Sequence, residues 1–252
     1  MSRIEPLQHA GTYEILTPLE FLRIMPQIIE RAGRTSYQSY RDREITAESA
    51  EKFCRMLIER GHESVLEHSS MTVRFDGCSR GFTHELVRHR LASPTQESTR
   101  YVDYRLDEGK VAVVVPPGLD AVGFDSFTRD LQAALDAYSR TRDRGMRSNS
   151  ARQLLPIAIK SEIVVTANFR EWRHIFSLRC DRPAHWEIRE VMCRLLVELQ
   201  STLPGVFDDF VYGGQCGDGI DWYARLLSDT LFNRQVKLRK LRDQATRGSH
   251  EG

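Results

Sequence analysis

The chain has 252 residues, of which 40% are hydrophobic, enough for one large globular domain or two small ones with their own core. Its formal net charge of +1 excludes a chain that is drawn as a whole onto nucleic acid or a membrane surface. Any binding of anions must therefore come from local clusters of charge. Five cysteines without a C-x-x-C pair argue against a disulfide framework or a structural zinc site and fit a reducing cytosol.

The N-terminal segment MSRIEPLQHAG has no apolar signal core, and no apolar run approaches the ~20 residues of a membrane helix. We expect a cytoplasmic protein without membrane contact. The basic residues are 31 arginines and 5 lysines, and arginine is the side chain suited to phosphate and carboxylate. A GC-rich genome would also explain the general excess of arginine, but it would not explain local clustering.

Helices dominate the first half of the chain. Thr17-Pro18-Leu19-Glu20 is typical of a capping box and predicts a helix to about Arg34. Thr46 is expected to cap a second helix, whose apolar stripe ends at Gly61. Alternating residues predict a half-buried strand over 71–75, and a further helix is expected over 80–91.

The second half alternates short strands with helices. The pattern predicts strands over 110–115 and 162–167, and helices over 124–144, 150–155, 170–178, 183–199 and 221–244. This order predicts an α+β protein with a small mixed sheet covered by helices. We expect a single domain over residues 1–220, followed by a C-terminal helix and basic tail over 221–252.

A first polar cluster, GHESVLEHSS, spans residues 61–70 between a predicted helix and a predicted strand. A helical zinc motif would place its histidines four residues apart, whereas His62 and His68 are six apart. A metal site is therefore not expected. The segment remains open to two interpretations, a polar capping loop or a loop that contacts a ligand.

A second cluster, HELVRHRLASPTQESTRY, spans residues 84–101. On a helix, Arg88 and Arg90 would point about 200° apart, so they share no helical face and can bind different groups only if the helix ends there. The following residues are rich in hydroxyls and amides, a mixture that can hold a phosphate and read a polar ring. A solvated surface is the alternative.

A third cluster begins at Arg152 in SARQLLP and continues in TANFREWRHIFSLR, which ends at Arg179. Arg170 and His174 lie four residues apart and should share a helical face. The aromatic residues of the same helix, among them Trp172, are expected in the core. An arginine at a helix C-terminus is by itself ordinary, because it interacts favourably with the helix dipole.

The three clusters together resemble one family, the flavin-dependent thymidylate synthases. Its signature is R-H-R followed after seven residues by Ser, and here Arg88-His89-Arg90 is followed after seven residues by Ser98. The GHES-x-x-EH, ARxxLP and TAN-x-R-x-x-x-x-x-x-x-LR segments also match in order, over about residues 15–215. Motifs of the Rossmann, P-loop and hydrolase types are absent from the sequence.

The resemblance implies an enzyme that methylates C5 of a uridine nucleotide. Methylene-tetrahydrofolate would give the carbon, reduced FAD the hydride, and NADPH would reduce the flavin. It also implies an α+β fold and a homotetramer whose active sites draw on several subunits. The family uses no cysteine nucleophile on the pyrimidine, in agreement with the absence of a convincing one here.

Carried over residue by residue, the resemblance implies two sets of contacts. The contacts to FAD would be Ser64, Glu67, Arg88, His89, Arg90, Asn168, Arg170 and His174. The contacts to the nucleotide would be Glu85, Arg88, Gln96, Ser98, Thr99, Arg100, Arg152 and Arg179. Arg179 would be the catalytic residue, stabilising negative charge on the pyrimidine ring, and Ser98 would orient the nucleotide rather than attack it, because no base adjoins it.

Two positions depart from the family pattern. Pro94 stands where near relatives have an aromatic residue, and Ile157 stands where a polar one is expected. Proline removes a backbone donor, so a differently shaped nucleotide loop is expected. We favour dUMP as substrate, with UMP as an alternative. A remote alternative of another class is an arginine-rich RNA-binding module, which the near-zero net charge and the lack of RNA-binding motifs disfavour.

Overall fold

The computed structural model describes residues 3–36, 38–39, 44–104 and 110–226. The strands of this part are β1 (Arg3–Leu7), β2 (Thr12–Ile15), β3 (Ser70–Ser79), β4 (Ser93–Gln96), β5 (Lys110–Val114), β6 (Lys160–Asn168), β7 (Phe210–Gln215) and β8 (Asp221–Arg225). The α-helices are α1 (Leu19–Thr35), α2 (Ala47–Glu59), α3 (Arg80–Leu86), α4 (Ala121–Asp143), α5 (Ser148–Ala151), α6 (Phe169–Arg179) and α7 (Trp186–Thr202). Two short 3₁₀ helices, η1 (Glu63–His68) and η2 (Arg152–Leu154), complete the order.

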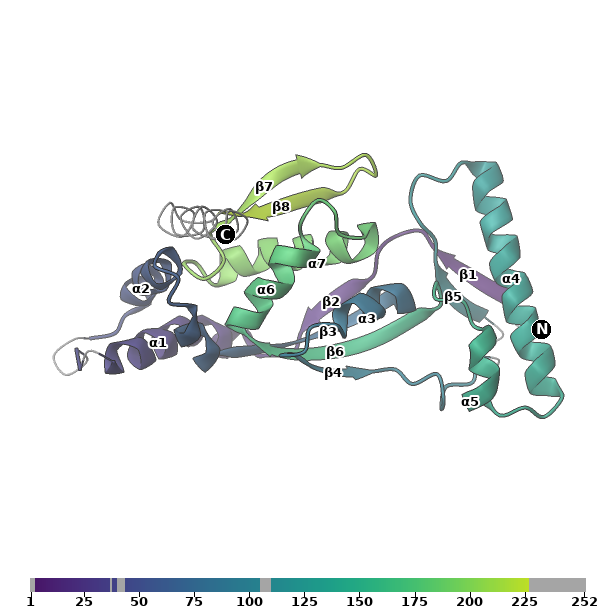
Figure 1. Cartoon of the computed structure of the whole chain (residues 1–252), viewed down its shortest axis with the longest axis horizontal. Helices are drawn as coiled ribbons and strands as arrows, with labels where there is room; N and C mark the ends of the chain where they lie inside the picture. The colour runs from purple at the N-terminus through teal and green to yellow at the C-terminus, as the bar shows by residue number, and fades with distance from the viewer. Residues whose placement is uncertain (1–2, 37, 40–43, 105–109, 227–252) are drawn as a thin grey trace, which may run out of the picture.

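A four-stranded antiparallel sheet, in the order β2-β3-β6-β4, forms the centre of the molecule (Figure 1). Its two long strands alternate between buried and half-buried residues because successive side chains point to opposite faces. The buried residues of β3 and β6 join side chains of α3, α6 and α7 in one hydrophobic core. Those three helices therefore cover one face of the sheet.

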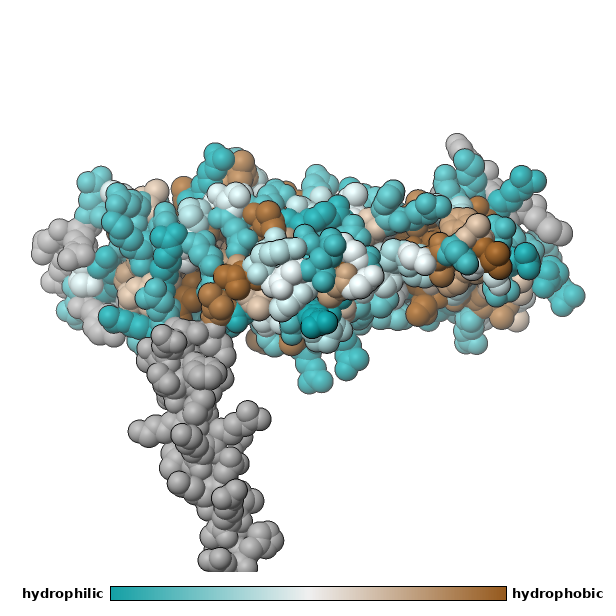
Figure 2. All heavy atoms as spheres, turned by 90° about the horizontal axis from the view of Figure 1, so that it is seen from above, coloured by the Kyte–Doolittle hydropathy of each residue, from teal (hydrophilic) through white to brown (hydrophobic). Residues whose placement is uncertain are grey.

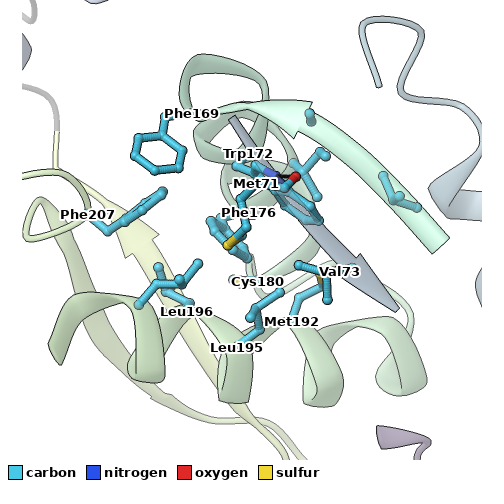
Figure 3. Close-up of a cluster of buried hydrophobic side chains, with 14 of the residues drawn as sticks. Met71, Val73, Phe169, Trp172, Phe176, Cys180, Met192, Leu195, Leu196 and Phe207 are labelled. Atoms are coloured by element: carbon cyan, nitrogen blue, oxygen red, sulfur yellow. Dashed lines mark hydrogen bonds between the residues drawn. The ribbon is translucent and has the colours of Figure 1, made fainter. Parts of the chain in front are cut away.

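The packing of α6 shows how this core holds its helices in place (Figure 3). Trp172 is fully buried, and its indole N–H donates to the Met71 carbonyl of β3 at 3.1 Å. Its ring stacks on Phe176 at 5.8 Å between ring centroids. The expectation that the aromatic residues of this helix form core is confirmed.

Two smaller sheets flank the central one (Figure 1). β1 and β5 pair in parallel, and with α4 and η2 they surround a second, smaller core that includes Tyr138 and Val111. In Figure 2, apolar residues of the face in view gather at this end of the molecule. β7 and β8 form an antiparallel hairpin that packs on α7.

A cluster of four charged residues ties η1 to the hairpin. Arg173 of α6 is fully buried and donates to both oxygens of Asp209, at 2.7 and 2.6 Å. Arg225 of β8 also pairs with Asp209, at 3.1 Å, and with Glu63 of η1. Buried charges of this kind persist when each is paired and hydrogen-bonded, and here two arginines alternate with two carboxylates.

The α+β class is confirmed, although parallel and antiparallel strands lie in separate sheets rather than in one mixed sheet. The cap at Thr46 is confirmed: its side chain accepts from the Ser49 N–H, and the Ser49 hydroxyl completes the capping box. The cap at Thr17 is wrong. Its hydroxyl accepts instead from the Thr72 N–H at 2.9 Å, and α1 begins at Leu19 without a side-chain cap.

Two further element predictions are wrong. The helix expected over 80–91 ends at Leu86, and residues 221–225 of the helix expected over 221–244 form β8. The remainder of that helix, from residue 227, lies outside the described residues. The predicted domain boundary after residue 220 falls in the β7–β8 hairpin. Among the described helices, none has the length and apolar character that crossing a bilayer requires.

Candidate active site

The R-H-R segment forms a turn that follows α3. Ser79 caps the helix, since its hydroxyl accepts from the Phe82 N–H at 3.1 Å, and the helix ends at Leu86. In the turn, His89 is buried, with 5% of its surface exposed, and the arginines on either side of it are exposed. Within the described residues, neither Arg88 nor Arg90 has an ion-pair partner. The turn therefore presents two available guanidinium groups.

Arg179, the last residue of α6, points its guanidinium at this turn. Its Nε donates to His89 Nε2 at 3.0 Å, its Nη1 to Glu85 Oε2 at 2.5 Å, and its Nη2 to the Glu85 carbonyl at 3.0 Å. An arginine has five N–H donors, so two remain for a ligand. α6 thus carries the guanidinium, and α3 with its following turn holds it in place.

His89 has to be neutral in this arrangement, because a nitrogen that accepts a hydrogen bond carries no proton. Burial, together with the positive charge of Arg179 and the neighbouring His174, lowers the pKa of His89 to about 4. His174 meets its ring edge to face, at 5.7 Å between ring centroids. Glu171 Oε1 lies 3.6 Å from the other ring nitrogen, Nδ1.

A second group of expected site residues lies where η1 meets the first turn of α6. Arg170 Nη1 donates to Glu67 Oε1 at 2.5 Å, between two half-exposed side chains. Asn168 is the N-cap of α6 and accepts from the Glu171 N–H at 2.9 Å. Ser64 lies exposed on η1. All four were expected to contact FAD, and the fold brings them together.

A third group surrounds the loop that follows β4. Arg152 of η2 donates to the Thr99 hydroxyl at 3.2 Å, and the Ser98 hydroxyl accepts from the Arg100 N–H at 3.3 Å. Gln96, expected to contact the nucleotide, is the last residue of β4, and its side-chain amide donates to Thr83 of α3. The strand β4 itself was not predicted.

The expected nucleotide contacts fall into two sets, although Gln96 at the end of β4 bonds to Thr83 of α3. Among the residues that the structure describes, no hydrogen bond or ion pair joins Glu85, His89 or Arg179 to the group of Ser98, Thr99, Arg100 and Arg152. We call the first set the α3–α6 half-site and the second the β4-loop half-site.

Sequence reasoning assigned no role to Glu171. Its side chain is 5% exposed, and burial raises the pKa of its carboxyl. A glutamate at the third position of a helix is common for capping reasons alone, so the sequence carries no signal that would single it out. The described residues include no group of three or more histidine, cysteine, aspartate or glutamate side chains that could hold a metal ion.

Comparison with known proteins decides the family. The model of the family described as "Thymidylate synthase complementing protein" matches residues 21–205. The chain belongs to the flavin-dependent thymidylate synthase family. It is 37% identical to the flavin-dependent thymidylate synthase of Pyrococcus furiosus, over 68% of this chain and 70% of the relative. It is 39% identical to that of Geobacter sulfurreducens, over 69% of this chain and 77% of the relative.

Solved structures of flavin-dependent thymidylate synthases and of related methylases share the fold. The UMP/dUMP methylase PolB from Streptomyces cacaoi, bound with 5-Br dUMP, superposes with a TM-score of 0.66 at 24% identity, covering 82% of this chain and 95% of that one. The thymidylate synthase of Helicobacter pylori with FAD and dUMP superposes with a TM-score of 0.61 at 22% identity, covering 79% and 98%. The family model and the sequence relatives confirm the resemblance found in the sequence motifs, and the RNA-binding alternative is not supported.

Proposed function

We propose that this protein converts dUMP to dTMP by reductive methylation of C5 of the uracil ring. Methylene-tetrahydrofolate would donate the carbon. When bound, FAD would supply the hydride, and NADPH would restore the reduced flavin. The observation that carries the proposal is Arg179, held by His89 and Glu85 with two N–H donors still available, in a chain whose residues 21–205 match the family.

The proposed role of Arg179 follows from charge. Negative charge on the uracil ring, formed as N3 ionises or as O2 and O4 accept electron density, makes C5 a better nucleophile, and a fixed guanidinium stabilises that charge. Donors that are already oriented avoid the cost of reorganisation during the reaction. In an acyl-transfer site, removal of one such donor lowers the rate about 10²–10³-fold. The contacts to His89 and Glu85 supply that orientation before substrate binds.

The residues around the R-H-R turn fit a flavin dinucleotide. Arg88 and Arg90 are exposed and without an ion-pair partner in the described chain, and arginine suits a diphosphate. We propose that these two hold the diphosphate and that Ser64, Glu67, Asn168, Arg170, His89 and His174 complete the cofactor site. The Arg170–Glu67 ion pair would open or rearrange as the cofactor binds, because a phosphate competes for the same guanidinium.

We further propose that the active enzyme is a homotetramer in which one subunit completes the site of another. Within the described residues no hydrogen bond or ion pair joins the named residues of the α3–α6 half-site to those of the β4-loop half-site, as expected if each meets its complement on another subunit. Arg152, Ser98, Thr99 and Arg100 of one subunit would bind the nucleotide that Arg179 of a second subunit activates. Such sharing is natural in symmetric oligomers, where each surface recurs in every subunit.

The experiment that tests the function is a competition assay. Purified protein with FAD, NADPH and methylene-tetrahydrofolate receives equal amounts of dUMP and UMP, and mass spectrometry reads the products. Methylated dUMP alone supports the proposal. Substantial 5-methyl-UMP would indicate that Pro94, which pairs with Val165 in an edge strand, accompanies a site open to ribose. A yellow protein that methylates neither nucleotide would contradict the proposed function.

A further inference from the structure

Glu171 places a buried carboxylate directly behind the imidazole of His89. Its side chain is 5% exposed and that of His89 is 3% exposed, with Oε1 and Nδ1 3.6 Å apart. No other ion-pair partner of Glu171 is present in the described chain. Asn168 accepts from its backbone N–H, so the carboxylate is held by the first turn of α6 rather than by a flexible loop.

The two sides of the imidazole are therefore opposite in polarity. Arg179 approaches Nε2 with an N–H group at 3.0 Å. A proton on Nε2 would point at this N–H group, and the two would repel each other. Glu171 approaches Nδ1 with a carboxylate oxygen, which attracts a proton to that nitrogen. Both neighbours favour the same tautomer, in which the proton lies on Nδ1 and Nε2 accepts. The hydrogen bond made by one ring nitrogen commonly decides the state of the other.

We propose that Glu171 is a positioning residue of the methylation reaction, because its carboxylate keeps the proton of His89 on Nδ1 and so keeps Nε2 as the acceptor that orients the guanidinium of Arg179. Glu171 does not reach the substrate and acts through His89. The inference rests on the proposed function in one respect, that Arg179 serves the nucleotide. The tautomer of His89 itself does not depend on which substrate is used.

The charged groups around His89 agree with this role. On α6 they are Arg179, His174 and Glu171, and on α3 Glu85 faces the site through Arg179. Burial and the neighbouring positive charge keep the pKa of the imidazole low, so the ring stays neutral at neutral pH. The effect of Glu171 on Arg179 therefore requires only that one tautomer of His89 is favoured, and the charge of the imidazole does not change.

The tautomer can be measured directly. Solid-state NMR of the full-length protein labelled with ¹⁵N-histidine distinguishes protonated from bare ring nitrogens, and a His89→Gln sample identifies the His89 signals. The wild type should show a proton on Nδ1 and a bare Nε2. Glu171→Leu, which removes the acceptor, should show a mixture of tautomers, and Glu171→Gln, which keeps an oxygen without the charge, should lie between. A wild-type proton on Nε2, or a Glu171→Leu spectrum identical to the wild type, would overturn the proposal.

Kinetics provides the second arm. We expect Glu171→Leu to lower kcat about tenfold or more, as loss of an outer-shell partner of a functional histidine does, with partial recovery in Glu171→Gln. In a His89→Gln background, Glu171→Leu should cause no further loss, because its effect passes through His89. If kcat of the double variant instead falls by the product of the two single-variant factors, Glu171 has a general structural role.

A matched control separates this effect from lost stability. Glu30 of α1 is another buried helical glutamate, and it is paired with Arg34 and Ser49 rather than with a residue of the R-H-R turn. Glu30→Gln should lower the melting temperature and leave both kcat per flavin and the His89 tautomer unchanged. Failure of the wild type to methylate dUMP would contradict the proposed function, while the NMR measurement would still show whether Glu171 sets the tautomer of His89. If Glu171→Leu fails to fold, Glu171→Gln carries both arms.

Discussion

Arg179 and Arg88 show how two arginines near one histidine can have separate tasks. Arg179 is tied by three hydrogen bonds to His89 and Glu85, whereas Arg88 is exposed without an ion-pair partner in the described chain. A tied guanidinium is suited to stabilise a transition state, and a free one is suited to capture an anion. The sequence located both residues but could not distinguish their states, because the distinction depends on partners ninety or more residues away in the case of Arg179.

This difference predicts different outcomes for two substitutions. Arg179→Ala should lower kcat about 10²–10³-fold, by analogy with the removal of one oriented donor, while FAD still co-purifies. Arg88→Ala should lose both activity and flavin, because it removes the proposed diphosphate contact. Turnover and the flavin absorbance per subunit measure the two effects. An Arg179→Ala protein that is colourless but active, or an Arg88→Ala protein that is yellow and active, would reverse the assignments.

His89 predicts a pH dependence of stability. Its pKa is lowered to about 4 in the folded protein, against an ordinary value of about 6.5. Between these values the unfolded chain binds a proton that the folded chain does not, so the free energy of unfolding falls as pH decreases. Glu171 and Glu187, whose carboxyl pKa values are raised by burial, contribute with the opposite sign.

The contribution of His89 to the pH dependence of stability is therefore measured as the difference between the wild type and His89→Gln. Melting temperatures at about pH 7 and about pH 5, at one protein concentration, should fall further for the wild type than for His89→Gln, which lacks the titrating group. Equal decreases in the two proteins would mean that His89 does not carry this part of the pH dependence.

At the scale of elements, α6 combines capping and cofactor roles in one residue. Asn168 ends β6 and caps α6 through its hydrogen bond to the Glu171 N–H, and it is also a proposed contact of FAD. Asn168→Ala should lower stability by about 1 kcal/mol, the usual contribution of an N-cap, and should also lower flavin content. Asn168→Ser keeps a capping oxygen but no amide, so it should keep the melting temperature and still lose flavin. Full flavin content in Asn168→Ser would limit Asn168 to capping.

The helices and long strands were predictable from the sequence because their signals are local. Thr46 caps α2 with Ser49 three residues away, and the alternation in β3 lies within the strand itself. Thr17 was assigned wrongly because its hydroxyl is taken by Thr72, fifty-five residues away. Short strands such as β4 and β8 were missed because their pairing with β6 and β7 defines them.

At the scale of the whole molecule, the proposed sharing of each active site between two subunits predicts that two inactive variants restore activity when they assemble together. Arg179→Ala damages the α3–α6 half-site and Arg152→Ala damages the β4-loop half-site. Co-expression of the two should restore activity at sites that combine an intact half from each chain, about a quarter of all sites if subunits assort at random. The singly expressed variants are the controls, and light scattering reports the oligomeric state. A mixture no more active than its parents would place the complete site within one subunit.

The four-charge cluster that ties η1 to the hairpin also constrains how this protein can change over time. Each arginine of the cluster pairs with both carboxylates, so loss of any one of Glu63, Arg173, Asp209 or Arg225 would leave two like charges to share one partner and destabilise the fold, whereas joint replacement by apolar residues can be neutral or stabilising. A charged cluster and an apolar one can therefore both be stable, but single substitutions lead from one to the other only through less stable proteins. Among descendants of one ancestor, we expect them to be inherited together or replaced together, as a block that joins η1 and α6 to the β7–β8 hairpin.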